Sequence, residues 1–489
     1  MNPQPVTGPG VVIGLDLGTT SVKALALNAG GEVLARSGGG YALRSGPDAA
    51  DGGDFGAATQ DAAEVLDAAL TALQDLAAQL VSVPVLAIVP SAAMHSLVLV
   101  GQDGEVLAPA LTWADTRPAE TLSGLRAVLD AAESYARSGC PLQAPYHPAR
   151  LWWLAQTQPE VFARVARFVS LTDLLLYRLT GQWATSVGLA STTGLWNLHT
   201  ATWDAQTLGV LGISEAQLPA VHDARAVVGT VQTGPLKGAP VLAGSTDGAL
   251  ANLGAGAGPG ETVVTVGTSG AVRRLATEPG LDPQARTWSY RLDLPTHLIG
   301  GAVNNGGLLL DWVRRGWYSE LDSQAGFAHL LSEAAGVPAG AEGLSLLPYL
   351  TGERSPYWRG DLSATLHGLK LAHGRAPVAR AALEAVAFSL AQVWDLLGGR
   401  VPVSSTGGLA ASPLWNGLLA GVLGVPVRVQ GAADASAIGA ALLGHPAAAL
   451  QAVRQRARNA EVVRPAGEDV APLRAARARW QALYARLYD

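Results

Sequence analysis

The chain has 489 residues, which is longer than one hydrophobic core usually supports, so two large domains are expected. Apolar residues make up 49% of the sequence and charged residues 15%, a balance that argues against a disordered chain. The formal net charge is -6 and no run of lysines or arginines occurs, which argues against nucleic acid and anionic membranes as partners.

Cysteine content and hydropathy indicate a cytoplasmic protein. Cys140 is the single cysteine, so an intrachain disulfide and a metal site with several thiolate ligands are both excluded. The first ten residues lack a basic start followed by an apolar core, and charges such as Asp16 and Lys23 interrupt the longest apolar runs. We therefore expect neither a signal peptide nor a membrane span.

The N-terminal part predicts three consecutive strands. Residues 11–36 contain a buried strand, a tight turn, a second strand, a turn at Gly30-Gly31 and a third strand. Helices are expected between the strand groups, because apolar residues recur there at a spacing near 3.6. The helical stretches are residues 61–80, 171–181, 378–398 and, as an amphipathic packing helix with Trp480, Leu483, Tyr484 and Leu487 on or near one stripe, 471–488.

The first tight turn carries the sequence Asp16-Leu17-Gly18-Thr19-Thr20. Gly18 lets the backbone approach an anion closely, and Thr19 and Thr20 offer hydroxyl and N–H donors to phosphate oxygens. Asp16 can hold a hydrated Mg²⁺. The turn therefore suits a phosphate group, and an ordinary hairpin turn is the alternative interpretation.

A related pattern returns about 250 residues later, where a predicted strand at 261–266 leads into Gly267-Thr268-Ser269-Gly270. The second turn has the same chemistry of hydroxyls and glycine. Two such turns at equivalent strand ends indicate a duplicated α/β plan, with a cleft between the halves in which both turns clamp one polyphosphate. We place the domain boundary near residue 243, which gives domains 11–243 and 244–489.

Two further segments carry polar residues between a strand and a helix. Asp247 follows an apolar strand and lies near a helix start, where a carboxylate can take the proton of a substrate hydroxyl; helix capping is the alternative. Gly407 and Gly408 leave room for a flat ligand such as adenine, and Ser412-Pro413 suits a helix start. A plain turn and cap is the alternative for this second segment.

Taken in their order along the chain, these motifs resemble the FGGY carbohydrate kinases, which share their fold with hexokinase, actin and the heat-shock chaperone ATPases. The resemblance runs from near residue 11 to near residue 445 and includes LPYLTGERSPYW at 347–358. It implies an α/β fold of two actin-like (ribonuclease H-like) domains with an ATP and sugar cleft between them. It also implies ATP and Mg²⁺ as cofactors, Asp247 as the catalytic base and Asp16 as the Mg²⁺ residue, through water. The implied cofactor-binding residues are Asp16, Gly18, Thr19, Thr20, Gly267, Thr268, Ser269, Gly407, Gly408 and Asn416.

A narrower resemblance concerns the acceptor substrate. Ala93-Met94-His95 is similar to the gluconate kinase branch, whereas xylulose kinases usually carry glutamine before the Met-His pair. The segments 112–117 and 301–307 and the Gly139-Cys140-Pro141 stretch with the following His147-Pro148 are similar to the same branch. The substrate residues that this resemblance implies are Met94, His95, Trp113, Asp115, Arg117, Asn304 and Asn305.

Gluconate carries a carboxylate, which needs a cationic or multi-donor partner. Arg117, His147 and Arg150 are the candidates, although Arg117 can instead pair with Asp115. Arg150 stands where the gluconate kinases often have lysine.

The predicted function is ATP-dependent phosphorylation of a terminal hydroxyl, with D-gluconate as the substrate and 6-phospho-D-gluconate as the product. D-xylulose or another polyol is the alternative within the family, and a non-sugar ATPase of the actin-like fold is the alternative from another class. The expected partner is a small-molecule sugar or sugar acid, with neither nucleic acid nor membrane. The sequence leaves a homodimer open.

Overall fold

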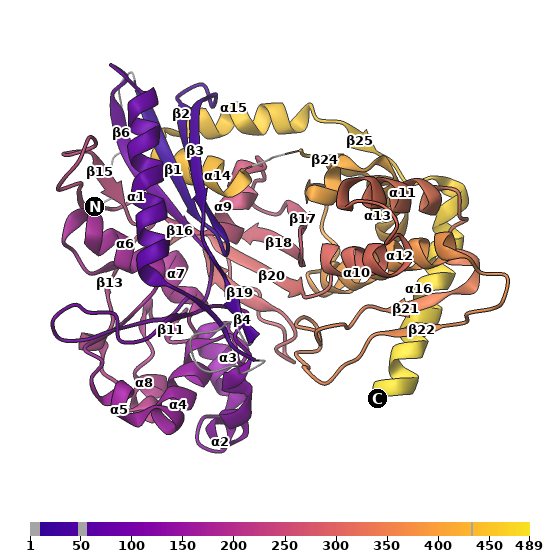
Figure 1. The fold of residues 1–489 in the computed structure, drawn as a ribbon, viewed down its shortest axis with the longest axis horizontal. Coiled ribbons are helices and arrows are strands. Elements are labelled where there is room, and N and C mark those ends of the chain that lie inside the picture. Colours follow the sequence, from indigo (N-terminus) through magenta and orange to yellow (C-terminus); the bar gives the residue numbers. More distant parts are fainter. Residues whose placement is uncertain (1–9, 47–55, 432–433) are drawn as a thin grey trace. The chain divides into compact units, whose positions relative to one another are not determined.

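The computed structural model describes residues 10–46, 56–431 and 434–489 and divides into two compact units (Figure 1). Unit 1 comprises Met1–Gly258, Leu275–Leu298 and Asp434–Arg456, and unit 2 comprises Pro259–Arg274, Ile299–Ala433 and Ala457–Asp489. Each unit combines helices with a sheet, which confirms the predicted α/β class and the two large domains. The predicted cleft between the domains stays a prediction.

Unit 1 is built on a seven-stranded sheet with the order β14-β15-β6-β1-β2-β3 and with β16 paired to β6. The first three strands form the predicted antiparallel meander, and β6 runs parallel to β1. The strands are β1 (Val11–Leu17), β2 (Ser21–Asn28), β3 (Val33–Gly40), β6 (Val85–Ala92), β14 (Val227–Thr230), β15 (Pro240–Leu242) and β16 (Ser245–Thr246).

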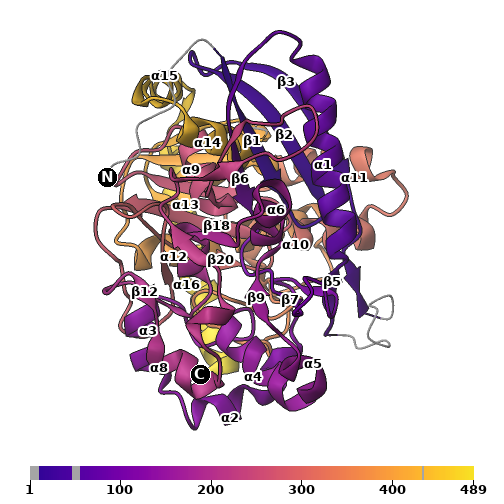
Figure 2. The ribbon, with the colours of Figure 1, turned by 90° about the vertical axis from the view of Figure 1, so that its left-hand side faces the viewer.

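Strand β1 faces a different layer of helices on each side of the sheet. Ile13 and Leu15 point into a core shared with α1 (Ala62–Gln79) and α6 (Leu171–Thr180), which Figure 2 shows beside the strands. Gly14 points the other way, onto α14 (Ala435–Gly444), because successive side chains of a strand alternate. Helix α9 (Asp247–Gly254) packs against α14.

The packing of α14 brings backbone against backbone. A Cβ atom built on Gly14 would lie 1.9 Å from the carbonyl oxygen of Ala437, and one on Gly439 would lie 1.8 Å from that of Leu250 in α9. No side chain fits at such distances, so only glycine permits this approach. Helix α14 therefore forms an integral layer of unit 1, although the chain reaches it only after unit 2.

The units do not follow the single predicted boundary near residue 243. Strand β16 pairs in parallel with β6, and α9 continues directly from β16, so the chain stays in unit 1 as far as Gly258. Asp247 consequently lies in unit 1, whereas the sequence assigned it to the C-terminal domain. The difference arises because a strand as short as β16 gives no periodic signal in the sequence.

The remainder of unit 1 holds a second hydrophobic core, formed by residues between Leu97 and Leu218. Its short strands are β4 (Arg44–Ser45), β5 (Ala58–Gln60), β7 (Val98–Val100), β8 (Ala110–Leu111), β9 (Arg167–Val169), β10 (Ala184–Ser186), β11 (Trp196–Asn197), β12 (Thr202–Trp203), β13 (Ala220–His222) and β19 (Trp288–Arg291). Its helices are α2 (Leu122–Arg126), α3 (Ala131–Ser138), α4 (His147–Thr157), α5 (Pro159–Ala163), α7 (Val187–Thr192) and α8 (Ala205–Leu211), and α15 (Ala447–Arg458) follows α14.

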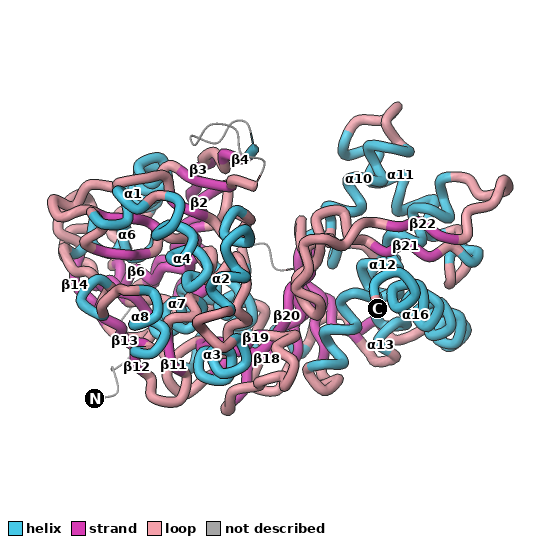
Figure 3. The backbone as a smooth tube through the Cα atoms, turned by 90° about the horizontal axis from the view of Figure 1, so that it is seen from below, coloured by secondary structure: helices cyan, strands magenta, loops and turns pink. Residues whose placement is uncertain are grey.

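Unit 2 contains the strands β20-β18-β17-β23-β24-β25, which are neighbours in this order. Strand β17 runs antiparallel to β18 and parallel to β23. The strands of this unit are β17 (Thr262–Val266), β18 (Gly270–Ala276), β20 (His297–Val303), β21 (Ser345–Leu347), β22 (Thr365–His367), β23 (Val403–Gly407), β24 (Val427–Val429) and β25 (Val462–Val463). Its helices are α10 (Gly307–Trp317), α11 (Ser323–Ala335), α12 (Arg375–Leu396), α13 (Pro413–Leu423) and α16 (Gly467–Tyr488) (Figure 3).

The four predicted helices are present, as α1, α6, α12 and α16. Trp480, Leu483 and Tyr484 of α16 pack against Phe388 of α12, as the amphipathic pattern predicts. Leu487 does not join them, since it is 47% exposed. Within the described residues, α12 is long and apolar enough to cross a membrane, but 89% of its most apolar window is buried, which is typical of a core helix.

Candidate active site

Three parallel strands of unit 1 end at the same edge of the sheet. In the register of β1, β6 and β16, Asp16 pairs with Ser91, and Ser91 pairs with Ser245. Asp247 follows β16 directly as the first residue of α9, as the sequence predicts. The fold therefore brings Asp16 and Asp247 to one edge, the place where α/β sheets usually bind ligands.

The carboxyl group of Asp16 lies in a setting that disfavours its charge. Burial raises the pKa of Asp16 to about 7; a hydrogen bond from the Ser91 hydroxyl opposes this rise, and the negative charge of Asp247 adds to it. The Ser91 Oγ to Asp16 Oδ1 distance is 2.6 Å. A cation bound here would offset both burial and repulsion, so the site fits Mg²⁺.

No group of three His, Cys, Asp or Glu side chains suited to a metal occurs within the described residues. Mg²⁺ usually keeps several waters and takes one or two carboxylates together with substrate phosphates.

Asp247 also contacts its own helix. Its Oδ1 accepts the N–H of Gly248 at 2.6 Å, and the Ser436 hydroxyl of α14 donates to its carbonyl oxygen at 3.3 Å. A carboxylate in the first turn of a helix is favoured by the helix dipole. The carboxyl group of Asp247 thus accepts a hydrogen bond from the first turn of α9, although the N-cap residue is Thr246, and it lies close enough to Asp16 to affect the pKa of Asp16.

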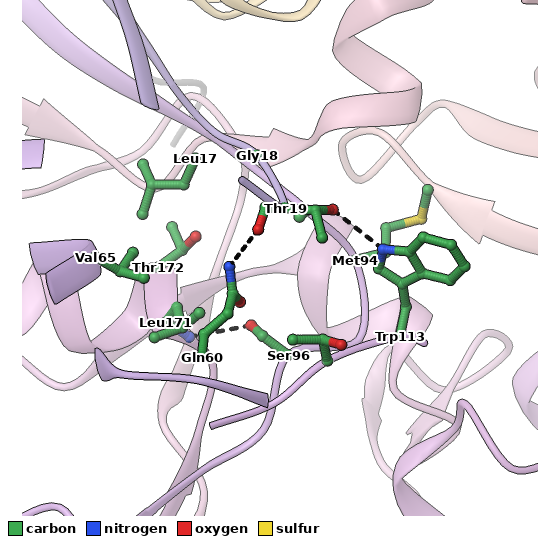
Figure 4. Close-up of a pocket in the computed structure, with 12 residues that line it drawn as sticks. Leu17, Gly18, Thr19, Gln60, Val65, Met94, Ser96, Trp113, Leu171 and Thr172 are labelled. Atoms are coloured by element: carbon green, nitrogen blue, oxygen red, sulfur yellow. Dashed lines mark hydrogen bonds between the residues drawn. The ribbon is translucent and has the colours of Figure 1, made fainter. Parts of the chain in front are cut away.

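The first phosphate turn lies against a small pocket of about 10 Å³ (Figure 4). Trp113 Nε1 donates to the Thr19 hydroxyl at 3.1 Å, and Gln60 Nε2 donates to the Thr19 carbonyl at 2.7 Å. Gly18 and Met94 also line the pocket, whereas Thr20 is exposed. The structure therefore joins the predicted phosphate residue Thr19 to the predicted substrate residue Trp113.

Gln60 was not identified from the sequence. It ends the three-residue strand β5 just before the N-cap residue of α1, Asp61, and its side chain is buried. In the sequence, Gln60 is marked only by its position directly before the predicted helix at 61–80. Strand β5 is too short to be predicted.

His95 lies in a turn with a left-handed backbone, at φ = 68°. Such a φ is uncommon for residues other than glycine and occurs often at functional sites. Its Nδ1 lies 3.0 Å from the carbonyl oxygen of Thr192, and its ring meets the edge of Tyr146 at a centroid distance of 5.0 Å. The Tyr146 hydroxyl is in turn 2.6 Å from that of Tyr290. The turn is thus fixed on several sides.

Asp115 and Arg117 form a buried ion pair. Arg117 Nη2 donates to Asp115 Oδ2 at 2.7 Å and its Nε donates to Oδ1 at 3.0 Å, while the guanidinium stacks over Trp153. The two residues are 1% and 4% exposed. Of the two partners predicted for Arg117, the structure shows Asp115.

The other two candidate carboxylate partners are also buried. Arg150 is 0% exposed and donates hydrogen bonds to the carbonyl oxygens of His95 and Thr112. Burial and the charge of Arg150 lower the pKa of His147 to about 3, so the imidazole is neutral. Arg150 thus donates to backbone carbonyls and burial disfavours the charged form of His147, and a carboxylate-binding role for either residue stays a prediction.

In unit 2, Gly267, Thr268 and Ser269 form the turn between β17 and β18. The backbone at the start of α10 closes one side of this turn, because Gly307 N donates to the Gly267 carbonyl at 2.8 Å and Leu308 N to that of Thr268 at 2.9 Å. A Cβ atom on Gly267 would meet nothing within 4 Å. The turn is therefore held from one side and open at Gly267.

The predicted adenosine residues lie beside this turn. Gly407 pairs with Val266 across β17 and β23; it has φ = 84°, and a Cβ atom there would lie 2.4 Å from the Val266 carbonyl oxygen. Gly408 begins the short helix η5 (Gly408–Ala411) and has open space at its Cβ position. Asn416 is buried and donates to the Ala410 carbonyl at 2.8 Å, which fixes η5.

Asn304 and Asn305 bind the segment 347–358 of unit 2. Asn304 Nδ2 donates to the Thr351 carbonyl at 3.0 Å and its Oδ1 accepts from Arg354 Nε at 2.7 Å, while Asn305 Nδ2 donates to the Gly352 carbonyl at 2.9 Å. Their side chains thus position this segment. Burial also raises the pKa of Glu353 to about 7, a feature that sequence reasoning did not single out.

Comparison with known proteins gives a consistent result for both halves of the chain. Residues 11–254 match the N-terminal domain of the FGGY family of carbohydrate kinases, and residues 262–448 match its C-terminal domain. A gluconokinase of Bacillus subtilis (strain 168) is 30% identical over 451 residues, which cover 88% of this chain and 86% of the relative. A xylulose kinase of the same organism is 29% identical over 452 residues, with coverages of 88% and 87%.

Two solved structures from Lactobacillus acidophilus are similar over 98% of this chain and 98% of their own. A ligand-bound xylulose kinase superposes with a TM-score of 0.89, and a gluconate kinase with a TM-score of 0.88, each at 28% identity.

Proposed function

The chain belongs to the FGGY family of carbohydrate kinases, and from this premise we propose that it transfers the γ-phosphoryl group of ATP to the terminal hydroxyl of D-gluconate, giving 6-phospho-D-gluconate. One observation carries the choice of gluconate. A small residue, Ala93, lines the pocket beside the phosphate turn together with Met94. It precedes the Met94-His95 pair, as in the gluconate kinase branch that the sequence resembles. The similarity to a gluconokinase supports the same choice.

In this proposal Asp247 takes the proton of the acceptor hydroxyl as the hydroxyl oxygen attacks the γ-phosphorus, and the bond from that phosphorus to the bridging oxygen breaks, so that ADP leaves. The hydrogen bond from the Gly248 N–H holds the carboxyl group in one orientation. Asp16 would hold Mg²⁺ through water, and the bound ion would supply charge neutralisation for the phosphates. The turns at Gly18 and Gly267 bind phosphate through backbone N–H groups and hydroxyls. Met94, His95 and Trp113 hold the acceptor.

D-xylulose is the second candidate, because a xylulose kinase structure is as similar to the chain as the gluconate kinase structure. The deciding experiment measures kcat/KM for gluconate and xylulose at one saturating ATP concentration, with ribulose and glycerol alongside. Gluconate is expected to give the highest value. If xylulose does, the substrate assignment fails and the family assignment stands.

The variant Ala93→Gln sharpens this experiment. It introduces the glutamine that xylulose kinases usually carry, so we expect the ratio of kcat/KM for gluconate to that for xylulose to fall by about tenfold or more, on the scale of one altered pocket contact. An unchanged ratio in a folded variant would remove Ala93 as the basis of the choice.

A further inference from the structure

Arg150 bridges two turns that come from distant parts of the sequence. One is the His95 turn, which follows β6, and the other begins at Thr112, which follows β8 and leads into Trp113. The two terminal nitrogens of Arg150 bind one turn each, since Nη1 donates to the His95 carbonyl and Nη2 to the Thr112 carbonyl. Both turns carry proposed substrate residues.

Helix α4 and the charge of Asp115 fix Arg150 in its buried position. It lies on α4, whose first residue, His147, donates its backbone N–H to the Thr193 carbonyl at 2.9 Å. The guanidinium is 0% exposed, and Asp115 is the negative charge that favours its ionised form. Burying an arginine is costly unless its donors are used. The backbone carbonyls of the two turns use the two terminal nitrogens, whereas the buried Nε has no hydrogen-bond partner within the described residues.

The bridge extends to the phosphate turn. Thr112, which accepts from Arg150, is followed by Trp113, whose Nε1 donates to the Thr19 hydroxyl (Figure 4). A displacement of the Thr112 carbonyl would therefore move the indole relative to Thr19.

We propose that Arg150 is a positioning residue for the acceptor site, which sets the His95 turn and the Trp113 turn at a fixed separation without touching the substrate itself. The proposal rests on the proposed function, because it requires that His95 and Trp113 hold the acceptor. It replaces the predicted role of Arg150 as a carboxylate partner. The planar fork of arginine offers one separated donor to each carbonyl, whereas lysine carries its three donors on one nitrogen and reaches less far.

The test compares Arg150→Lys, which keeps the charge and loses the fork, with Arg150→Met, which loses both. The acceptor is whichever of gluconate, xylulose, ribulose and glycerol the wild type phosphorylates best, so an error in the substrate assignment leaves the test valid. We expect the acceptor KM to rise about tenfold in Arg150→Lys and more in Arg150→Met, because the turns that hold the acceptor would lose their preorganised separation. The nucleotide Kd should change less than twofold.

Arg380→Lys is the matched control. Arg380 is also a buried arginine, 5% exposed, but it pairs with Glu384 on α12 in unit 2. We expect this variant to lower the Tm without changing the acceptor KM. The proposal is wrong if both Arg150 variants lower only the Tm and kcat while the KM stays unchanged. It is also wrong if Arg150→Lys behaves as wild type and Arg150→Met selectively loses gluconate over xylulose, because the charge would then be what matters.

Discussion

Replacement of Asp16 by Asn should stabilise the ligand-free protein while it weakens the site. Burial and the charge of Asp247 raise the pKa of Asp16 to about 7 from 3.8, so the folded chain binds this proton more tightly than the unfolded chain. The stability that the proton provides is full below pH 3.8 and is lost as the pH rises to about 7. Asparagine does not ionise, so it avoids the free-energy cost of placing a charge at this buried position.

The size of the effect follows from the pKa difference. Three pKa units at 1.36 kcal/mol each set an upper limit of about 4 kcal/mol on the cost of ionising Asp16 in the folded protein. Asp16→Asn should thus gain up to that amount relative to wild type at pH 8, and close to nothing from this source at pH 4. The gain appears between these values, mainly from pH 4 to pH 7.

The assay is urea unfolding with EDTA and without nucleotide, at pH 4, 6 and 8, for wild type, Asp16→Asn and Asp103→Asn. Asp103 lies exposed in a surface turn, and its replacement should change the free energy of unfolding by less than about 0.5 kcal/mol at every pH. If the difference in the free energy of unfolding between Asp16→Asn and wild type does not grow with pH, ionisation of Asp16 does not destabilise the folded protein and the reasoning is wrong.

Three other changes test the site and its scaffold. Asp247→Asn keeps the oxygen that accepts from Gly248 and removes the proposed base. The kcat should therefore fall about 10²–10⁴-fold while ATP still binds. A variant that keeps more than half of the wild-type turnover would exclude Asp247 as the base. Gly267→Val should fold, because its Cβ meets nothing within 4 Å, and should weaken nucleotide binding in calorimetry; an unchanged Kd would show that this turn does not contact ATP. Gly439→Ala in α14 should lower the free energy of unfolding by about 1–3 kcal/mol, because its Cβ would clash with the α9 backbone. Gly417→Ala in α13, where the space is open, should raise it by about 0.5–1 kcal/mol. Thermal unfolding measures both, and changes of the same sign would contradict the packing argument.

The sequence predicts best what depends on periodicity and on local turn chemistry. The β1–β3 meander and helices α1, α6 and α12 follow from apolar spacing, and the start of α9 at Asp247 follows from the preference for an acidic residue there. These features are local, so a short window of residues contains all the information that determines them.

What the sequence could not predict depends on contacts between distant segments. Arg150 binds main-chain carbonyls, and a carbonyl is present at every residue, so nothing in the sequence marks its partners. The sequence offered two partners for Arg117, namely Asp115 and a ligand carboxylate, and the structure shows the pair with Asp115. Ser91 reaches Asp16 because the sheet pairs β6 with β1, and Gln60 reaches Thr19 from β5, which belongs to a separate small sheet.

The glycine contacts of α14 have a consequence for how this protein is made. The match to the N-terminal family domain ends at residue 254, yet the sheet face at Gly14 is covered by a helix that ends at residue 444. A ribosome adds about 5–20 residues per second, so the stretch from residue 254 to residue 444 takes roughly 10–40 s to synthesise, and the face stays uncovered for that time. A fragment that ends at residue 254 would leave that apolar layer bare and should aggregate. Unit 1, which contains the N-terminal strands, therefore completes its packing only late in synthesis, when α14 becomes available.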